Sequence, residues 1–168
     1  MNGDKQANDT IQVILTARDT GDRLARQEDL RFLPDESGQE NMLINIYPDV
    51  SYQVIEGFGG AFTEAGAYTL SRISPDLRQA AIRSYFDPVS GLGYSLCRTH
   101  INSCDFALGN YDYTARADDV DLQTFSIAHD RELLIPFIRS ALQARGAPIK
   151  LLASPWSPPA WMKTSDSL

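Results

Sequence analysis

Residues 149–163 read IKLLASPWSPPAWMK, and this stretch changes character at its centre. Its first part, Ile149 to Ala153, is a short apolar run that is typical of a strand buried on both faces of a parallel sheet. The proline-rich part cannot continue a strand, because proline has no N–H to donate. A rigid loop is therefore predicted at the carboxyl end of this strand, where barrels of alternating strands and helices build their sites. The loop carries Trp156 and Trp161, for which two roles stay open: contact with a ligand, or filling of the barrel end.

Composition limits the possible size and partners of this chain. Its 168 residues are 43% hydrophobic, as in an ordinary globular domain. A complete eight-stranded α/β barrel needs roughly 200 residues or more, so only part of one is predicted. The formal net charge is −7 and no Lys/Arg cluster occurs, which excludes nucleic acid as a partner because its binding rests on neutralised phosphates. A neutral or polar small substrate suits this charge better.

No motif for a metal or a cofactor is found. Cys97 and Cys104 lack the CxxC spacing of metal sites and are expected to be reduced thiols. The glycine-rich segment from Gly57 to Phe62 lacks the spacing of a phosphate-binding loop. The opening residues lack the regions of a signal peptide, and no apolar run reaches the roughly 20 residues of a membrane span. We expect no transmembrane segment; the compartment stays open, and is cytoplasmic if Met1 is the true start.

The first 53 residues carry β patterns alone. Two-residue alternation predicts a strand from Ile11 to Thr16 and another from Met42 to Tyr47. A charged segment from Asp22 to Glu40 separates them. We therefore expect residues 1–53 to form a separate β layer and residues 54–168 to form a second domain.

Residues 54–168 alternate between strands and helices. The predicted elements, in order, are a strand leading from Val54, a helix from about Thr63, a helix from Ser74 to Asp87, a strand within Gly93 to Ile101, a helix from about Asp130 to Arg145 interrupted by Pro136, and the strand from Ile149. This alternation predicts parallel strands joined by right-handed crossovers. Glycines before the first of these helices are expected to let the backbone pack closely, or to let a strand bend at a barrel edge.

Polar side chains follow the second predicted strand, as they follow the third. Asp105, beside Phe106, combines a carboxylate with an apolar wall; it can accept hydrogen bonds from two sugar hydroxyls, or cap a loop by accepting backbone N–H groups. Arg98, if buried, needs a partner carboxylate, for which Glu64 and Asp105 are the candidates. Glu64 also suits the first turn of its helix, where the macrodipole favours a carboxylate. His100 has no adjacent nucleophile and is predicted to be a hydrogen-bonded structural residue.

Three segments together match a known family: GFGGAFTEAGA at 57–67, SYFDPVSGLGYSLCRTHINSCDF at 84–106 and LLASPWSPPAWMKT at 151–164. In these motifs and their order the chain resembles glycoside hydrolase family 30, which includes lysosomal glucosylceramidase. The resemblance implies a (β/α)8 TIM barrel with a side β-sandwich. Residues 1–53 would supply N-terminal strands of the sandwich, and residues 54–168 the first three β/α units, truncated after the third strand. It also implies retaining hydrolysis of β-glucosides, among them glucosylceramide and β-1,6-glucans.

The resemblance assigns roles to single positions. Asp105 corresponds to the family's aspartate that hydrogen-bonds the sugar hydroxyls, and Trp156 to the tryptophan that lines the same pocket. Phe106, next to Asp105, is expected to contact the substrate as well. Arg98 corresponds to the arginine that organises the catalytic carboxylates.

The catalytic pair that the resemblance requires is not found in this sequence. Retaining glycosidases need two carboxyl groups about 5 Å apart. In this family they follow the fourth and seventh barrel strands, the first of them within an Asn-Glu-Pro motif, which this chain lacks. No catalytic residue is therefore assigned, and the 168-residue chain alone is expected to be inactive. Two functions stay open: part of a β-glycosidase acting on β-linked glucosides or glycolipids, or a non-catalytic sugar-binding or interaction remnant of such an enzyme.

Overall fold

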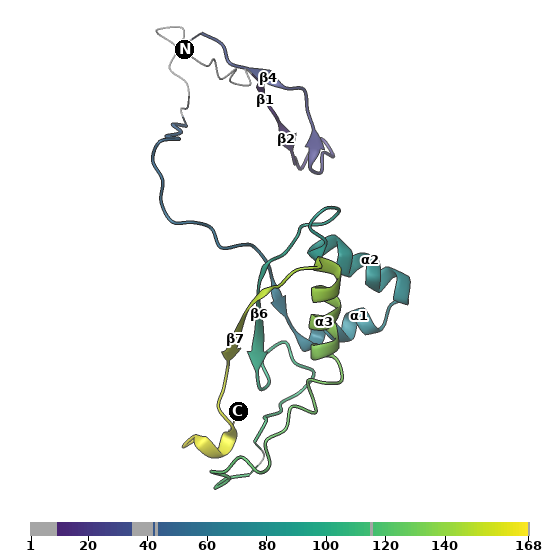
Figure 1. Cartoon of the computed structure of the whole chain (residues 1–168), viewed down its shortest axis with the longest axis vertical. Helices are drawn as coiled ribbons and strands as arrows, with labels where there is room; N and C mark the ends of the chain where they lie inside the picture. Colours follow the sequence, from purple (N-terminus) through teal and green to yellow (C-terminus); the bar gives the residue numbers. More distant parts are fainter. Residues whose placement is uncertain (1–9, 35–41, 43, 115, 168) are drawn as a thin grey trace. The chain divides into compact units, whose positions relative to one another are not determined.

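The computed structural model describes residues 10–34, 42, 44–114 and 116–167. Its contacts divide the chain into two compact units, Met1–Ser51 and Tyr52–Leu168. Figure 1 shows both units along the chain.

The first unit holds two short antiparallel pairs. Strand β1 (Thr10–Ile11) pairs with β4 (Leu30–Arg31). Strand β2 (Ile14–Leu15) pairs with β3 (Ala25–Arg26). The strand predicted from Ile11 to Thr16 is thus present as the short pieces β1 and β2.

The second predicted N-terminal strand is wrong. Met42 and residues 44–47, the described part of that prediction, form no strand. Ile44 and Ile46 are 90% and 82% exposed, so their alternation faces no packed surface. The strands that pair with β1 and β2 come from the charged segment instead, where no strand was predicted.

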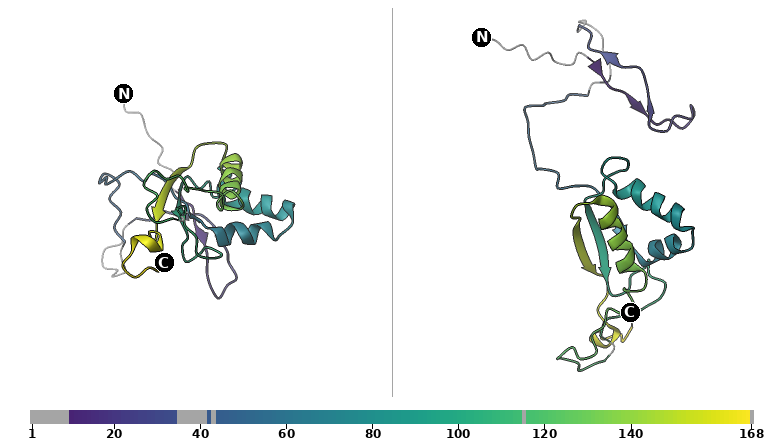
Figure 2. Two further views of the ribbon diagram at one scale, coloured as in Figure 1. Left: turned by 90° about the horizontal axis from the view of Figure 1, so that it is seen from below. Right: turned by 45° about the vertical axis from the view of Figure 1, so that its right-hand side comes forward.

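The second unit contains a parallel sheet with helices on one face. Strands β5 (Ala61–Phe62), β6 (Leu96–Ile101) and β7 (Lys150–Pro155) lie in the order β5-β6-β7. Both pairings are parallel, and Arg98 of β6 is opposite Ala61 of β5 and Leu152 of β7. Helices separate the strands along the chain and gather on the same side of the sheet in both side views (Figures 1 and 2). The predicted alternation and parallel pairing are confirmed.

Local signals place the helix ends well. Helix α1 (Glu64–Ser71) is capped by Thr63, and α2 (Pro75–Phe86) by Ser74, whose side chains accept hydrogen bonds from backbone N–H groups. Helix α3 (Leu134–Arg145) ends at Gly146, which has φ 67°. The prediction for α3 differs at its start. Pro136 lies in the first turn and interrupts nothing, because an N–H at that position has no partner within the helix.

The core of the second unit lies between the sheet and the helices. Phe62 of β5 is 2% exposed; its ring stacks on Phe86 with centroids 5.5 Å apart and meets the edge of Phe137 at 5.0 Å. Gly59 lies so close to β6 that a Cβ there would be 1.9 Å from the carbonyl oxygen of Leu96. The expected close packing of the glycine segment is therefore confirmed. Strand β5 begins later than the strand predicted from Val54, which is exposed and lies outside any strand.

Strand β7 is more exposed than predicted. Leu151 and Leu152 are 43% and 63% exposed, whereas burial on both faces was expected. Among the described strands β7 pairs with β6 alone, so its side chains lack neighbours from a strand on the second edge. A short 3-10 turn, η1 (Ala160–Met162), follows it.

Candidate functional site

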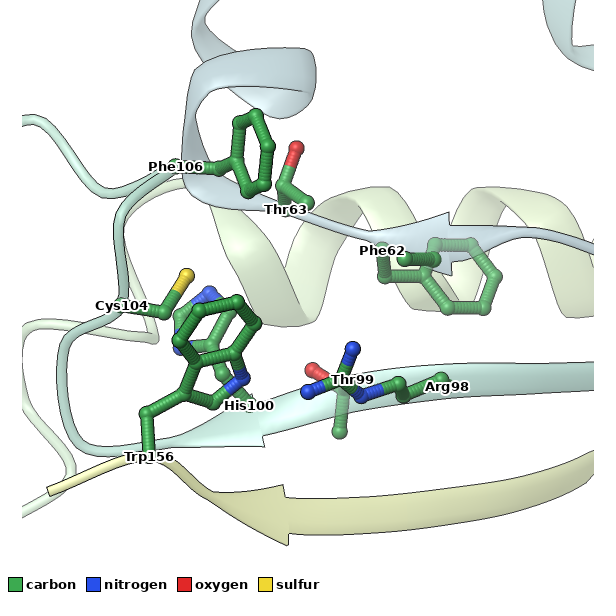
Figure 3. A pocket seen from close by; sticks show the side chains of 9 residues that line it. Phe62, Thr63, Arg98, Thr99, His100, Cys104, Phe106 and Trp156 are labelled. Atoms are coloured by element: carbon green, nitrogen blue, oxygen red, sulfur yellow. The ribbon is translucent and has the colours of Figure 1, made fainter.

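A cavity of about 380 Å³ opens at the carboxyl ends of β5 and β6. This volume is within the range of sites for small molecules, about 300–1,000 Å³. Most side chains that line the cavity are apolar or donate hydrogen bonds. They include Thr63, Arg98, His100, Cys104, Phe106 and Trp156 (Figure 3). A larger cavity lies among the helices, but parallel sheets of this kind place their sites at the carboxyl ends of the strands.

Parallel pairing of β6 and β7 brings Arg98 to Trp156. The guanidinium carbon of Arg98 lies 4.9 Å from the centre of the Trp156 ring, within the range of a cation–π contact. Arg98 also donates a hydrogen bond of 3.4 Å to the hydroxyl of Ser154. Trp156 remains 42% exposed, so part of its indole is available to a ligand.

The prediction that Arg98 pairs with the carboxylate of Glu64 or Asp105 is wrong. Within the described residues Arg98 forms no ion pair, and neither Glu64 nor Asp105 contacts it. Stacking on the indole and the hydrogen bond to Ser154 take the place of the carboxylate. The cavity thus presents a cation with no opposite charge among its lining residues.

Asp105 and Phe106 lie in a turn beside the cavity. The turn is closed by the N–H of Ala107, which donates to the carbonyl of Cys104 at 2.9 Å. The Phe106 carbonyl accepts a hydrogen bond of 2.9 Å from the N–H of Ala65 in α1, which fixes the turn to the helix start. Phe106 lines the cavity, whereas Asp105 is exposed and outside its lining. Within the described part of the chain, Asp105 accepts none of the backbone N–H groups that a capping role would need.

Glu64 is held by residues far along the chain. Its carboxylate is 4% exposed; one oxygen accepts the N–H of Leu108 at 2.8 Å, and the other lies 2.5 Å from Nε2 of His129. The Tyr111 ring stacks on His129 with centroids 3.8 Å apart. Asp130 accepts hydrogen bonds from the hydroxyls of Tyr111, at 2.7 Å, and of Tyr113. This network ties the loop after β6 to the start of α1.

The network shifts the titration of both tyrosines. Burial, and then the hydrogen bond to Asp130, raise the pKa of Tyr111 far above its usual value of 10.0. The same two causes raise the pKa of Tyr113. Sequence reasoning gave His129 and Asp130 no role. A signal for this network is present in the sequence: His129 and Asp130 are adjacent, and Tyr111 and Tyr113 lie two positions apart in the preceding loop.

His100 is buried with one ring nitrogen satisfied. The residue is 4% exposed, and its Nδ1 lies 2.6 Å from the carbonyl oxygen of Asn102. That hydrogen bond confirms the predicted structural contact. Nε2 of the same ring is buried and has no hydrogen-bond partner in the described structure.

The described residues contain no group of three His, Cys, Asp or Glu side chains placed to hold a metal ion. Over the same residues, no helix is long and apolar enough to span a membrane.

Residues 55–168 match the Glycosyl hydrolase family 30 TIM-barrel domain. Lysosomal acid glucosylceramidase of Mus musculus is 38% identical over 125 residues, which are 74% of this chain and 24% of that protein. The crystal structure of SrfJ from Salmonella typhimurium superposes with a TM-score of 0.75 at 36% identity, over 86% of this chain and 32% of that one. The endo-β1,6-glucanase BT3312 superposes with a TM-score of 0.67 at 28% identity, over 85% and 29%.

These similarities show that the sheet and helices of the second unit belong to a TIM-barrel fold. The chain spans about a quarter to a third of the length of these relatives.

Proposed function

This chain belongs to glycosyl hydrolase family 30, and from that premise we propose that it supplies the sugar-binding wall of a retaining β-glycosidase. The observation that carries the proposal is the convergence of Trp156 and Phe106 on one cavity at the carboxyl ends of the barrel strands. These two aromatic residues come from separate motifs, about 50 positions apart in the sequence.

The proposed binding mode uses the two kinds of surface that a pyranose presents. The C–H face of the sugar packs against the exposed part of the Trp156 indole, with Phe106 beside it. Arg98 stacks on Trp156 and limits the movement of the indole, which preorganises this face. Asp105, whose carboxylate is exposed next to the cavity, accepts hydrogen bonds from two sugar hydroxyls.

The catalytic carboxylates are proposed to lie outside these 168 residues. Retaining hydrolysis needs an acid/base and a nucleophile about 5–5.5 Å apart. No carboxylate is among the described residues that line the cavity, and Glu64 is engaged by Leu108 and His129. In this proposal residues 54–168 form the first three β/α units of the barrel, and residues 1–53 contribute strands to a side β-sandwich. Arg98, which lines the cavity, then supports carboxylates from later strands.

The substrates proposed are β-linked glucosides, of the glucosylceramide or the β-1,6-glucan type. Both types are supported by relatives: one is a lysosomal acid glucosylceramidase and another an endo-β1,6-glucanase. The cavity supports a sugar unit that both classes share, since its lining is apolar and aromatic apart from a few polar groups.

Tryptophan fluorescence of the 168-residue chain tests the sugar site directly. The chain has two tryptophans, so the emission of each can be measured alone in a variant that lacks the other. Trp161→Phe leaves Trp156 as the single indole, and Trp156→Phe leaves Trp161, whose indole N–H donates to the carbonyl of Thr114 at 3.0 Å. Titration with methyl β-D-glucopyranoside is expected to change the emission of the Trp161→Phe variant and not that of the Trp156→Phe variant. A response confined to the variant that lacks Trp156, or an absent response in both, would contradict the proposed site.

A further inference from the structure

His100, which lines the cavity, has a buried ring nitrogen without a hydrogen-bond partner in the described part of the chain. Nε2 of His100 has no hydrogen-bond partner among the described residues, although His100 is 4% exposed and lines the cavity. A buried polar atom that forms no hydrogen bond costs roughly 1–3 kcal/mol, so such atoms are rare unless water or a ligand satisfies them.

The hydrogen bond on the other side of the ring fixes the tautomer. Nδ1 lies 2.6 Å from the carbonyl oxygen of Asn102, which is an acceptor only, so Nδ1 carries the proton. The hydroxyl of Tyr111, 3.4 Å from Nδ1, agrees with this assignment. Its proton is donated to Asp130, so its oxygen faces Nδ1 as an acceptor. A neutral imidazole carries one N–H, and Nε2 therefore presents a lone pair.

This lone pair complements the other polar groups of the cavity. Arg98 donates hydrogen bonds and accepts none, and the indole of Trp156 likewise has a donor alone. The hydroxyl of Thr63 already accepts the N–H of Gly66 at 3.1 Å. Oγ1 of Thr99, which also lines the cavity, is likewise buried without a hydrogen-bond partner among the described residues, and as a hydroxyl it can donate as well as accept. A ligand with several hydroxyl groups needs acceptors as well as donors, and His100 supplies one at a depth where water is largely excluded.

We propose that His100 is a sugar-binding residue, whose Nε2 accepts a hydrogen bond from one hydroxyl of the glycoside held against Trp156. This inference rests on the proposed sugar site and adds a specificity contact to it. A sugar that lacks this hydroxyl would leave Nε2 buried without a partner and is expected to bind more weakly by about tenfold.

The test uses the two histidine rings as separate probes. The chain has two histidines, so long-range ¹H–¹⁵N correlation spectra of the labelled 168-residue chain contain two ring systems, assigned with His129→Gln. At pH 8, where a histidine is ordinarily neutral, His100 is expected to show a protonated Nδ1 and an unprotonated Nε2. Methyl β-D-glucopyranoside should shift the Nε2 signal of His100 upfield and leave the ring of His129 unchanged. Monodeoxy analogues then identify the hydroxyl, because one of them loses the shift.

Each outcome decides between the two proposals. If Trp156 emission responds to the sugar and the Nε2 signal does not, the inference is overturned and the proposed site stands. If neither responds, the proposed site fails and the inference fails with it. A proton found on Nε2 of the free chain would also overturn the inference.

Two variants provide an independent measurement of affinity. His100→Gln can place an amide oxygen near the position of Nε2 and is expected to retain affinity within about threefold. His100→Phe keeps a flat ring without an acceptor and should weaken binding by about tenfold. Equal affinity of the two folded variants would contradict the proposed contact.

Discussion

Replacing Glu64 by alanine should destabilise the second unit far more than removing a carboxylate from an equivalent exposed position. Glu64 is 4% exposed and accepts the N–H of Leu108, a charge-assisted hydrogen bond worth about 1.5–3 kcal/mol. The pair with His129 adds up to about 1 kcal/mol, because the histidine side chain is 41% exposed and solvent screens the interaction. We therefore expect Glu64→Ala to lower the free energy of unfolding by about 2.5 kcal/mol.

Asp76→Ala is the matched control. Asp76 also lies in the first turn of a helix, but it is exposed, and its loss removes about 0.3–1 kcal/mol of favourable interaction with the helix dipole. Urea unfolding followed by tryptophan fluorescence reports on the second unit, because both tryptophans lie in it. With a slope of about 1.5 kcal/mol/M, the midpoint should fall by about 1.7 M for Glu64→Ala and by less than about 0.7 M for Asp76→Ala. Equal shifts would refute the claim that Glu64 holds the loop after β6.

Three further outcomes are expected. Ile82→Ala removes three carbons from a residue that is 3% exposed and should lower the free energy of unfolding, measured in urea, by about 3 kcal/mol. Leu77, on the same helix, is 62% exposed, and Leu77→Ala should lower it by less than about 1 kcal/mol. Similar losses in the two variants would contradict the core assignment. In a catalytically active longer product of the gene, Asp105→Ala should lower kcat/KM by 100-fold or more, about 2.7 kcal/mol of transition-state stabilisation, and unchanged kinetics would remove Asp105 from the site. Because the pKa values of Tyr111 and Tyr113 are raised, the folded state keeps both phenols protonated and loses stability as the pH rises above about 10, where the unfolded state releases these protons. Unfolding curves between pH 9 and pH 11 should show this loss, and it should be smaller in Tyr111→Phe; an identical loss in that variant would contradict the network.

Features set by neighbouring residues were predictable from the sequence. Thr63 and Ser74 cap helices because a hydroxyl precedes each helix by one position, and Gly146 ends α3 because glycine adopts a positive φ easily. Parallel pairing followed from the alternation of strands and helices, and the family from three motifs. The cavity position followed from the rule that sites lie at the carboxyl ends of the strands.

Features that depend on distant partners were not predictable. Alternation in the segment from Met42 to Tyr47 resembles a strand, but a strand needs a neighbour to pair with, and the pattern does not encode one. The sequence separates Glu64 from His129 by 65 positions, so their contact emerges only when the loop folds back onto α1. Arg98 was assigned a carboxylate partner by the general cost of burying a charge, but an aromatic face and a hydroxyl meet that need here.

The central claim is that these residues form the sugar-binding wall of a β-glycosidase whose catalytic carboxylates lie elsewhere. The most direct test is the hydrolysis of an aryl β-glucoside by the 168-residue chain and, in parallel, by the longest product readable from its gene. The account predicts hydrolysis by a longer product that contains both carboxylates, and none by the 168-residue chain. Hydrolysis by the 168-residue chain alone would place the catalytic carboxylates among residues to which we assign other roles, and would contradict the account.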